Sequence, residues 1–347
     1  MSNVLFLAST PLHSLWALGI AAGAFGSDRC ALVVIDQRSE ERDFIAEALA
    51  AKMSAPFVET RRYEQVGKQP LRKLAHARAR MREISDYTRR FGPDYVATGN
   101  DRRAEFHAAL AAAPRAIGAY FDDGTASYSP LASKTVAQSA MVRAVANRVR
   151  SLMYGVPTER EPHLGVSRAV REAWVVLPDR VHPGLRAKPI RPIRPEWFQL
   201  PMVQAICADA TLRAGLDGRV LGGIQLLLAL PHDSLMREQP VIRERLQQIA
   251  DRTLAEGGTV AIKRHPRSRE LALDLPAQRV FELPQRLPLE ILAPLLNGTE
   301  VIGMLTSALI YLRFLGANVR VATLVPPGFA GNPIVDIYHS VGVELLS

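Results

Sequence analysis

Short apolar runs alternate with segments of helical periodicity along the first 125 residues, and this alternation restricts the possible folds more than any other feature. Consecutive strand–helix units of this length are typical of a parallel sheet with helices on both faces. The predicted strands are 4–8, 31–35, 56–59, 95–98 and 116–121, and the predicted helices are 11–22, 40–52, 71–90 and 102–113. No GxGxxG motif precedes the first predicted helix, so a nicotinamide cofactor is disfavoured.

The alternation stops at a segment rich in proline and arginine and then resumes. The later predicted strands are 225–230, 259–262, 279–281, 301–303 and 320–325, and the helices are 240–256, 287–296 and 308–315. A chain of 347 residues also exceeds what one hydrophobic core usually supports. We therefore predict an N-terminal Rossmann-like domain over 1–156, a basic crossover over 157–201 that could include a strand at 174–177, and a C-terminal Rossmann-like domain over 202–347.

The net charge of +9 indicates an anionic partner. A basic balance fits nucleic acid, a membrane surface or an anionic substrate. The chain has neither zinc-finger spacing nor the aromatic motifs of RNA-binding domains, so we expect no nucleic acid and favour nucleotide-sugars or acidic glycans. The two cysteines, Cys30 and Cys207, lack metal-ligand spacing and are expected to be reduced core residues. With no signal peptide and no apolar run long enough to span a bilayer, we expect a cytoplasmic protein.

Two adjacent aspartates, Asp122 and Asp123, follow the predicted strand 116–121 and precede Gly124. In open α/β sheets ligands bind at the carboxyl ends of the strands. One carboxylate there can act as a general base, and Asp122 is favoured because it continues the strand. The alternative is that both aspartates only cap a turn. Adjacent side chains at the end of an extended strand point apart, so metal chelation fits poorly and no metal is expected.

A basic cluster, KRHPR at 263–267, follows the predicted strand 259–262. Pro266 biases His265 away from helical geometry and holds the ring at the strand edge. Such a cluster suits a phosphate, which Lys263 and Arg264 would neutralise and His265 would hydrogen-bond. The alternative is a solvated basic turn.

Thr306 and Ser307 lie between the predicted strand 301–303 and the predicted helix 308–315. Helix N-termini bind phosphates through free backbone N–H groups, and hydroxyls add further donors there. A plain helix cap is the alternative. Glu290 lies in the first turn of the predicted helix 287–296, where a carboxylate also suits the helix dipole without any ligand.

The predicted strand 95–98 is followed by Asn100 and Arg102. These two residues could shape an acceptor site or merely cap the next helix. We also place His13, near the end of the first predicted strand, among the weak acceptor-site candidates.

With these residues in hand, the chain resembles the bacterial sialyltransferases, in particular the lipooligosaccharide sialyltransferase and polysialyltransferase families. The likeness rests on the order of the DDG motif, the K-x-H-P motif and the Thr-Ser pair, and on the opening LFLASTPL at 5–12. Motif-level identity covers about twenty residues, and topology covers the full length.

This resemblance implies a GT-B fold, in which two Rossmann-like domains have parallel sheets that face a cleft. It implies inverting, metal-independent transfer of sialic acid from a CMP-activated donor to the hydroxyl of a glycan or glycolipid. Asp122 or Asp123 would then be the base, and His265 would assist departure of the phosphate. Nucleotide contacts would come from the other motif residues, namely Lys263, Pro266, Glu290, Thr306 and Ser307. The families often show Glu-Asp-Gly where this chain has Asp-Asp-Gly, so the choice of base stays open.

Other functions share these motifs. The enzyme could transfer another CMP-activated acid such as Kdo or legionaminic acid, because the motifs do not touch the substituents of the sugar. There are two further alternatives. The chain could be a GT-B enzyme that uses a UDP- or GDP-sugar, or a non-catalytic protein that binds nucleotides or glycans. A homodimer is also considered.

The segment 136–154 is predicted to form an amphipathic helix, with Met141, Val145 and Leu152 on one face and arginines on or beside the other. Such a helix can lie in a lipid interface, which would make the protein peripheral on the inner face of the membrane. The alternative is that the apolar face packs on the core.

Overall fold

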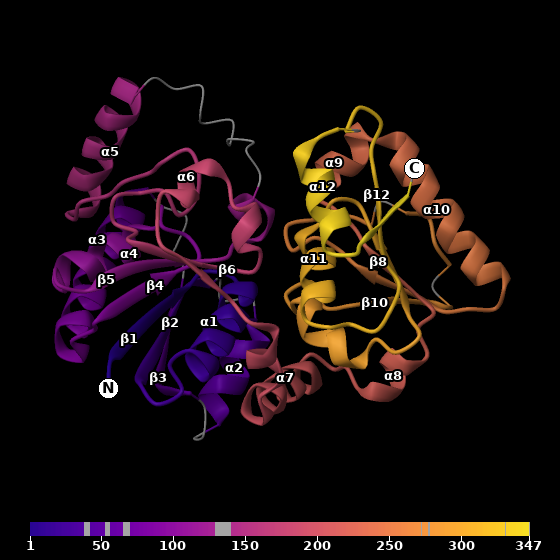
Figure 1. The fold of residues 1–347 in the computed structure, drawn as a ribbon, viewed down its shortest axis with the longest axis horizontal. Coiled ribbons are helices and arrows are strands. Elements are labelled where there is room, and N and C mark those ends of the chain that lie inside the picture. The colour runs from indigo at the N-terminus through magenta and orange to yellow at the C-terminus, as the bar shows by residue number, and fades with distance from the viewer. Residues whose placement is uncertain are drawn as a thin grey trace. The chain divides into compact units, whose positions relative to one another are not determined.

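The computed structural model describes residues 1–37, 42–52, 56–64, 70–128, 140–271, 273–276, 278–329 and 331–346. Two compact units make up the chain, an N-terminal unit over Met1–Ile206 and a C-terminal unit over Cys207–Ser347. Each unit is built around one parallel sheet with helices packed against it, so the predicted pair of Rossmann-like domains is confirmed (Figure 1). The boundary between the units falls within helix α7 (Pro201–Arg213).

The N-terminal sheet has the strand order β3-β2-β1-β4-β5-β6-β7, with every neighbouring pair parallel. Its strands are β1 (Asn3–Ala8), β2 (Arg29–Gln37), β3 (Phe57–Glu64), β4 (Tyr95–Thr98), β5 (Ile117–Phe121), β6 (Glu172–Val175) and β7 (Ile190–Pro192). Its helices are α1 (Pro11–Gly23), α2 (Phe44–Ala51), α3 (Pro70–Phe91), α4 (Ala104–Ala112), α5 (Ala140–Tyr154) and α6 (Pro183–Arg186), with 3-10 turns at Gly124–Ser127, Pro178–Arg180 and Pro195–Gln199. Strand β1 is buried from Val4 to Ala8 and runs through the middle of the core.

The C-terminal sheet has the strand order β10-β9-β8-β11-β12-β13, again parallel throughout. Its strands are β8 (Leu226–Ala229), β9 (Val260–Lys263), β10 (Val280–Glu282), β11 (Glu300–Gly303), β12 (Val321–Leu324) and β13 (Glu344–Leu346). Its helices are α8 (Gly218–Gly222), α9 (Asp233–Glu238), α10 (Pro240–Ala255), α11 (Ser307–Phe314) and α12 (Pro333–Ser340), and the predicted helix 287–296 is a 3-10 helix at Leu289–Leu295.

The segment predicted as a crossover, 157–201, has a different place in the structure. Its strands β6 and β7 extend the N-terminal sheet beyond β5. Its last part packs against α1, where the ring of Phe198 lies so close to Gly19 that a Cβ there would stand 2.5 Å from Cε1. Trp16 meets the same ring edge-on at 5.2 Å. The segment is therefore the far edge and outer packing of the N-terminal unit, which ends near Ile206.

Each sheet contains one point where the direction of winding reverses. In the N-terminal sheet this point lies between β1 and β4, and in the C-terminal sheet it lies between β8 and β11. Ligands of open α/β sheets bind beside such points, at the carboxyl ends of the strands. Among the candidate residues, His13 and Asn100 follow β1 and β4, and Thr306 follows β11, so these three lie beside the reversal points.

Candidate functional site

The N-terminal site is a hydrogen-bonded pair formed by His13 and Asp123. His13 lies in the first turn of α1, after β1, and its Nε2 is 2.8 Å from Asp123 Oδ1, after β5. The backbone N–H of Ser9 donates to His13 Nδ1 at 3.3 Å, which leaves the ring proton on Nε2, directed at the carboxylate. The His13 side chain is buried, whereas that of Asp123 is 26% exposed. The buried His13 ring thus orients the Asp123 carboxylate, and part of that carboxylate remains accessible to solvent.

Gly99 makes this pairing possible. It directly follows β4, and a Cβ at this position would stand 2.5 Å from His13 Cδ2 and closer still to Nε2. Any larger residue would displace the imidazole, so the glycine lets the ring lie across the end of β4. The His13 ring also meets Phe121 edge-on at 5.6 Å, which fixes its plane.

Asp122, expected to be the base, is fully buried instead. Its Oδ1 accepts a hydrogen bond from Ser127 Oγ at 2.8 Å, and its Oδ2 accepts from the hydroxyl of Tyr128 and from the backbone N–H of Val176 at 3.0 Å. Burial raises the pKa of Tyr128, and the charge of Asp122 raises it further. The phenol therefore stays protonated and donates to Asp122. Asp122 therefore ties β5 to the residues after β6, and both of its carboxylate oxygens are hydrogen-bonded inside the unit.

The other acceptor-side candidates are held in local structure. The side-chain oxygen of Asn100 accepts from the backbone N–H of Arg102 at 3.1 Å and closes a turn. The guanidinium of Arg102 donates to the backbone carbonyl of Pro162. Of the three weak candidates, only His13 meets the carboxylate pair.

In the C-terminal unit, His265 follows β9 in a tightly held loop. The backbone N–H of Arg267 donates to His265 Nδ1 at 3.1 Å, so the ring proton lies on Nε2. The His265 carbonyl accepts from Ser268 N at 2.9 Å and from Gln285 Nε2 at 3.2 Å. Burial lowers the pKa of His265, and the charges of His232, Arg267 and Lys263 lower it further, so the free imidazole is a neutral donor.

A second histidine, His232, accompanies His265 and was missed by sequence reasoning. It follows β8, and its Nδ1 accepts from the backbone N–H of Ser234 at 3.2 Å, which again leaves the proton on Nε2. The two imidazole rings meet edge-on with centroids 5.3 Å apart. Its signal in the sequence is the same as that of His265, a histidine just after an apolar run.

Lys263 and Glu290, predicted to contact a nucleotide, both lie inside the unit. Lys263 is 8% exposed, and its ammonium donates to the backbone carbonyls of Pro284 at 3.0 Å and Gln285 at 2.6 Å. Burial lowers its pKa to about 8, despite the nearby charge of Glu290. Glu290 is 5% exposed, and burial raises its pKa. Lys263 holds the loop after β10 and Glu290 is buried beside its charge, so their predicted role in nucleotide binding is not supported by their placement.

The rest of the predicted basic cluster is also divided. The Arg264 guanidinium pairs with Glu282, its Nε lying 2.6 Å from Oε1. Arg267 and Pro266 are exposed at the surface of the loop. Lys263 and Arg264 are thus each engaged with other protein groups, and their predicted role of neutralising a phosphate is not supported by their placement.

Thr306 and Ser307 stand where predicted, at the start of α11. Thr306 is the N-cap and Ser307 the first residue, and both are partly exposed. The turn before them places Leu305 in the left-handed region, with φ of 44°, and its N–H donates to Thr323 Oγ1 at 2.8 Å. The first N–H groups of a helix have no intrahelical acceptor, so this turn offers donors at the end of β11. Because β9, β8 and β11 are neighbours, these donors and the two histidines share one edge of the sheet.

Within the described ranges no three His, Cys, Asp or Glu side chains come together in a group that could hold a metal ion. Metal independence stays a prediction.

No protein-family model and no curated protein sequence matches the chain. Solved structures do match over its whole length. UDP-GlcNAc 2-epimerase from Methanocaldococcus jannaschii aligns with 100% of this chain and 89% of its own, at 12% identity and a TM-score of 0.51. UGT73P12 from Glycyrrhiza uralensis, complexed with glycyrrhetinic acid 3-O-monoglucuronide, aligns with 100% of this chain and 83% of its own, at 10% identity and a TM-score of 0.54. At such identities the likeness establishes the GT-B fold and nothing finer.

Proposed function

We propose that this protein is an inverting, metal-independent glycosyltransferase that uses a CMP-activated sialic acid or related nonulosonic acid. The observation that carries the proposal is the His13–Asp123 pair, because it presents one carboxylate, oriented and exposed, at a ligand-binding edge of a GT-B unit. The fold alone would not select transfer, since a nucleotide-sugar epimerase shares it.

Asp123 is the proposed general base. Its carboxylate accepts the proton of an acceptor hydroxyl while that oxygen attacks the anomeric carbon of the donor. The bond from the anomeric carbon to the phosphate oxygen breaks at the same time, its electron pair leaves with CMP, and the configuration inverts. His13 is a positioning residue, because its Nε2–H holds Oδ1 and leaves the remaining lone pairs of the carboxylate for the acceptor.

The proposed phosphate site lies at the C-terminal sheet edge. Nε2–H groups of His232 and His265, the hydroxyls of Thr306 and Ser307, and the first N–H groups of α11 are all donors of the kind that stabilise a departing phosphate. A bound phosphate would also raise the pKa of His265, opposing the burial that now lowers it. Lys263 and Glu290 are left out of this site.

The choice of CMP rests on the motif resemblance to bacterial sialyltransferases, and the acceptor is proposed to be a glycan or glycolipid. A thermal-shift comparison of CMP, UDP and GDP tests the nucleotide. At a hundredfold excess over Kd, a ligand stabilises the folded protein by about 2.7 kcal/mol, which raises Tm by degrees. We expect CMP to give the largest shift and His265→Gln to reduce it. A Tm shift with UDP and none with CMP would mean that the donor is a UDP-sugar, and it would leave the assignment of Asp123 as the base unchanged.

A further inference from the structure

Helix α5 presents its apolar side chains to solvent. Met141 is 79% exposed and Leu152 71% exposed, and Val145, Val149 and Met153 are exposed on the same side. Residues spaced by four, four and three share one face of a helix. The alternative expectation, that this face packs on the core, is wrong. Residues 136–139 of the predicted helix lie outside the described residues.

The polar side of α5 faces the protein. Asn147 Oδ1 accepts from the backbone N–H of Arg160 at 3.1 Å, and Ser151 Oγ accepts from the backbone N–H of Thr158 at 2.9 Å. A surface helix ordinarily turns its apolar side to the core, so the orientation here is reversed. Hydrogen bonds hold the helix in place and leave the apolar face outward.

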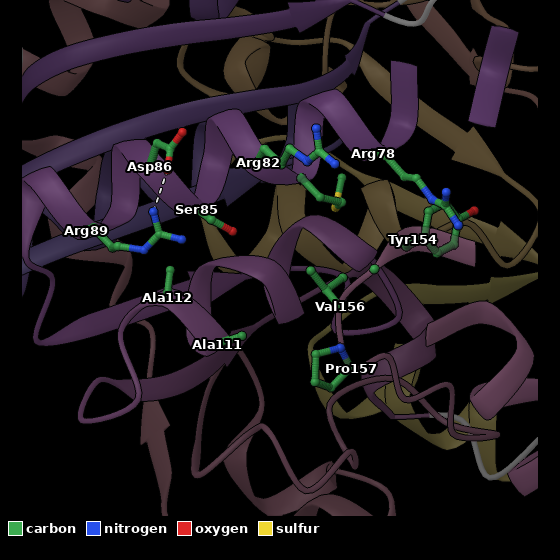
Figure 2. Close-up of a pocket in the computed structure, with 12 residues that line it drawn as sticks. Arg78, Arg82, Ser85, Asp86, Arg89, Ala111, Ala112, Tyr154, Val156 and Pro157 are labelled. Atoms are coloured by element: carbon green, nitrogen blue, oxygen red, sulfur yellow. Dashed lines mark hydrogen bonds and ion pairs between the residues drawn. The ribbon is translucent and has the colours of Figure 1, made fainter. Parts of the chain in front are cut away.

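The carbonyl end of α5 is fastened to α3. Arg78 Nε donates to the carbonyl of Met153 at 2.7 Å, and its Nη2 donates to that of Leu152 at 3.0 Å. A groove of about 550 Å³ runs along α3. Figure 2 shows Arg78, Arg82 and Arg89 spaced along it, and Val156 and Pro157 also line it. Asp86 pairs with Arg89 within it. The surface next to the apolar face is therefore basic.

A second basic cavity lies beside Asn147, on the polar side of α5 that faces the protein. It measures about 90 Å³, and its lining includes Arg102, Arg143, Arg150 and Arg160, with Glu161 as the one acidic lining residue among those the structure describes. Burial, followed by the charge of Arg150, lowers the pKa of Arg160. Cations crowded in this way favour an anion such as a phosphate group.

We propose that α5 docks the protein on an anionic lipid bilayer, with the apolar face entering the interface. The exposed Arg148 and the exposed arginines of the groove along α3, namely Arg78, Arg82 and Arg89, would bind lipid phosphates. Charge selects this occupant over a second copy of the chain. A symmetric dimer through α5 would bring the same arginine-rich surface against itself, in a protein of net charge +9. None of the helices in the described part of the chain has the length and apolar character that a membrane crossing requires. The docking is independent of the donor proposed above.

The test is cosedimentation of the full chain with vesicles of phosphatidylcholine mixed with phosphatidylglycerol, and of phosphatidylcholine alone. The double variant Met141→Ser/Leu152→Ser removes two exposed apolar side chains and should fold normally. Leu212→Ser is the matched control, because Leu212 is 64% exposed on α7. Arg148→Gln removes an exposed charge from α5, and Arg219→Gln removes one from α8.

We expect the wild type and both controls to bind the anionic vesicles at low salt and to bind phosphatidylcholine alone far less. The double serine variant should bind at least tenfold more weakly, and Arg148→Gln about fivefold more weakly, which is the usual contribution of one arginine near an anionic surface. Absence of wild-type binding at low salt would overturn the proposal, as would unchanged binding of the double variant. Sedimentation velocity checks the competing occupant, since a dimer that Met141→Ser/Leu152→Ser dissociates would also overturn it.

Discussion

Replacing Gly99 by alanine should disable the proposed base without touching it. The new Cβ would stand 2.5 Å from His13 Cδ2, so the imidazole must move by about 1 Å to reach van der Waals contact. A displacement of this size breaks or misaligns the hydrogen bond to Asp123 Oδ1, which is now 2.8 Å long. Misplacing a catalytic group by about 1 Å costs roughly 10²-fold in rate. The overpacking itself should cost about 1–3 kcal/mol of folding free energy.

The assay is the rate of CMP release from CMP-sialic acid with glycan acceptors present, alongside a thermal melt. Gly222→Ala is the matched control, because beyond the neighbouring backbone of its own helix no atom lies within 4 Å of the Cβ it would add. A double-mutant cycle sharpens the test. Since Gly99→Ala acts only through the imidazole, it should cost little further rate in a His13→Ala background. A Gly99→Ala variant that folds and keeps the wild-type rate would refute the role of the His13–Asp123 contact.

Asp123→Asn should lower the rate of transfer by roughly 10²–10⁴-fold and keep the CMP-induced Tm shift. Asp122→Asn should mainly lower Tm. If Asp122→Asn lost the rate and Asp123→Asn lost only stability, the two roles would be exchanged. Because the pKa of Lys263 is lowered to about 8, the unfolded state binds more protons than the folded one above that pH. As the pH goes from 8 to 10.5, the unfolding free energy of the wild type should therefore rise by up to about 3 kcal/mol relative to Lys263→Met. Denaturant titrations at each pH measure this difference, and a fall would contradict the lowered pKa of Lys263. His232→Gln should weaken CMP binding in calorimetry, as we also expect of His265→Gln, and an unchanged Kd would remove His232 from the proposed phosphate site.

The sequence predicted the strands that are buried and flanked by helices, because apolar runs between helical segments report the parallel sheet directly. It did not predict β7, which is short and lies at the sheet edge between prolines. The proline-rich composition of 178–201 is typical of a linker. The packing that fixes its end on the N-terminal unit, the ring of Phe198 against Gly19, joins residues far apart in the chain.

The site was predictable in its location more than in its roles. Nothing local distinguishes Asp122 from Asp123, since the partners that bury Asp122 include the N–H of Val176, 54 residues away. The burial of Lys263 was equally hard to predict, because the carbonyls that accept from its ammonium belong to the loop after β10, 21 and 22 residues away. His13 was singled out only weakly, and its contact with Asp123 spans 110 residues.

The central claim is that Asp123 is the base in transfer from a CMP-activated donor. The most direct test compares the rate of CMP release from CMP-sialic acid by the wild type and by Asp123→Asn, with EDTA present and glycan acceptors supplied. The account predicts that the wild type releases CMP at the same rate with and without EDTA and that Asp123→Asn is slower by roughly 10²–10⁴-fold. Equal rates for the two proteins, or release by the wild type that EDTA abolishes, would contradict it.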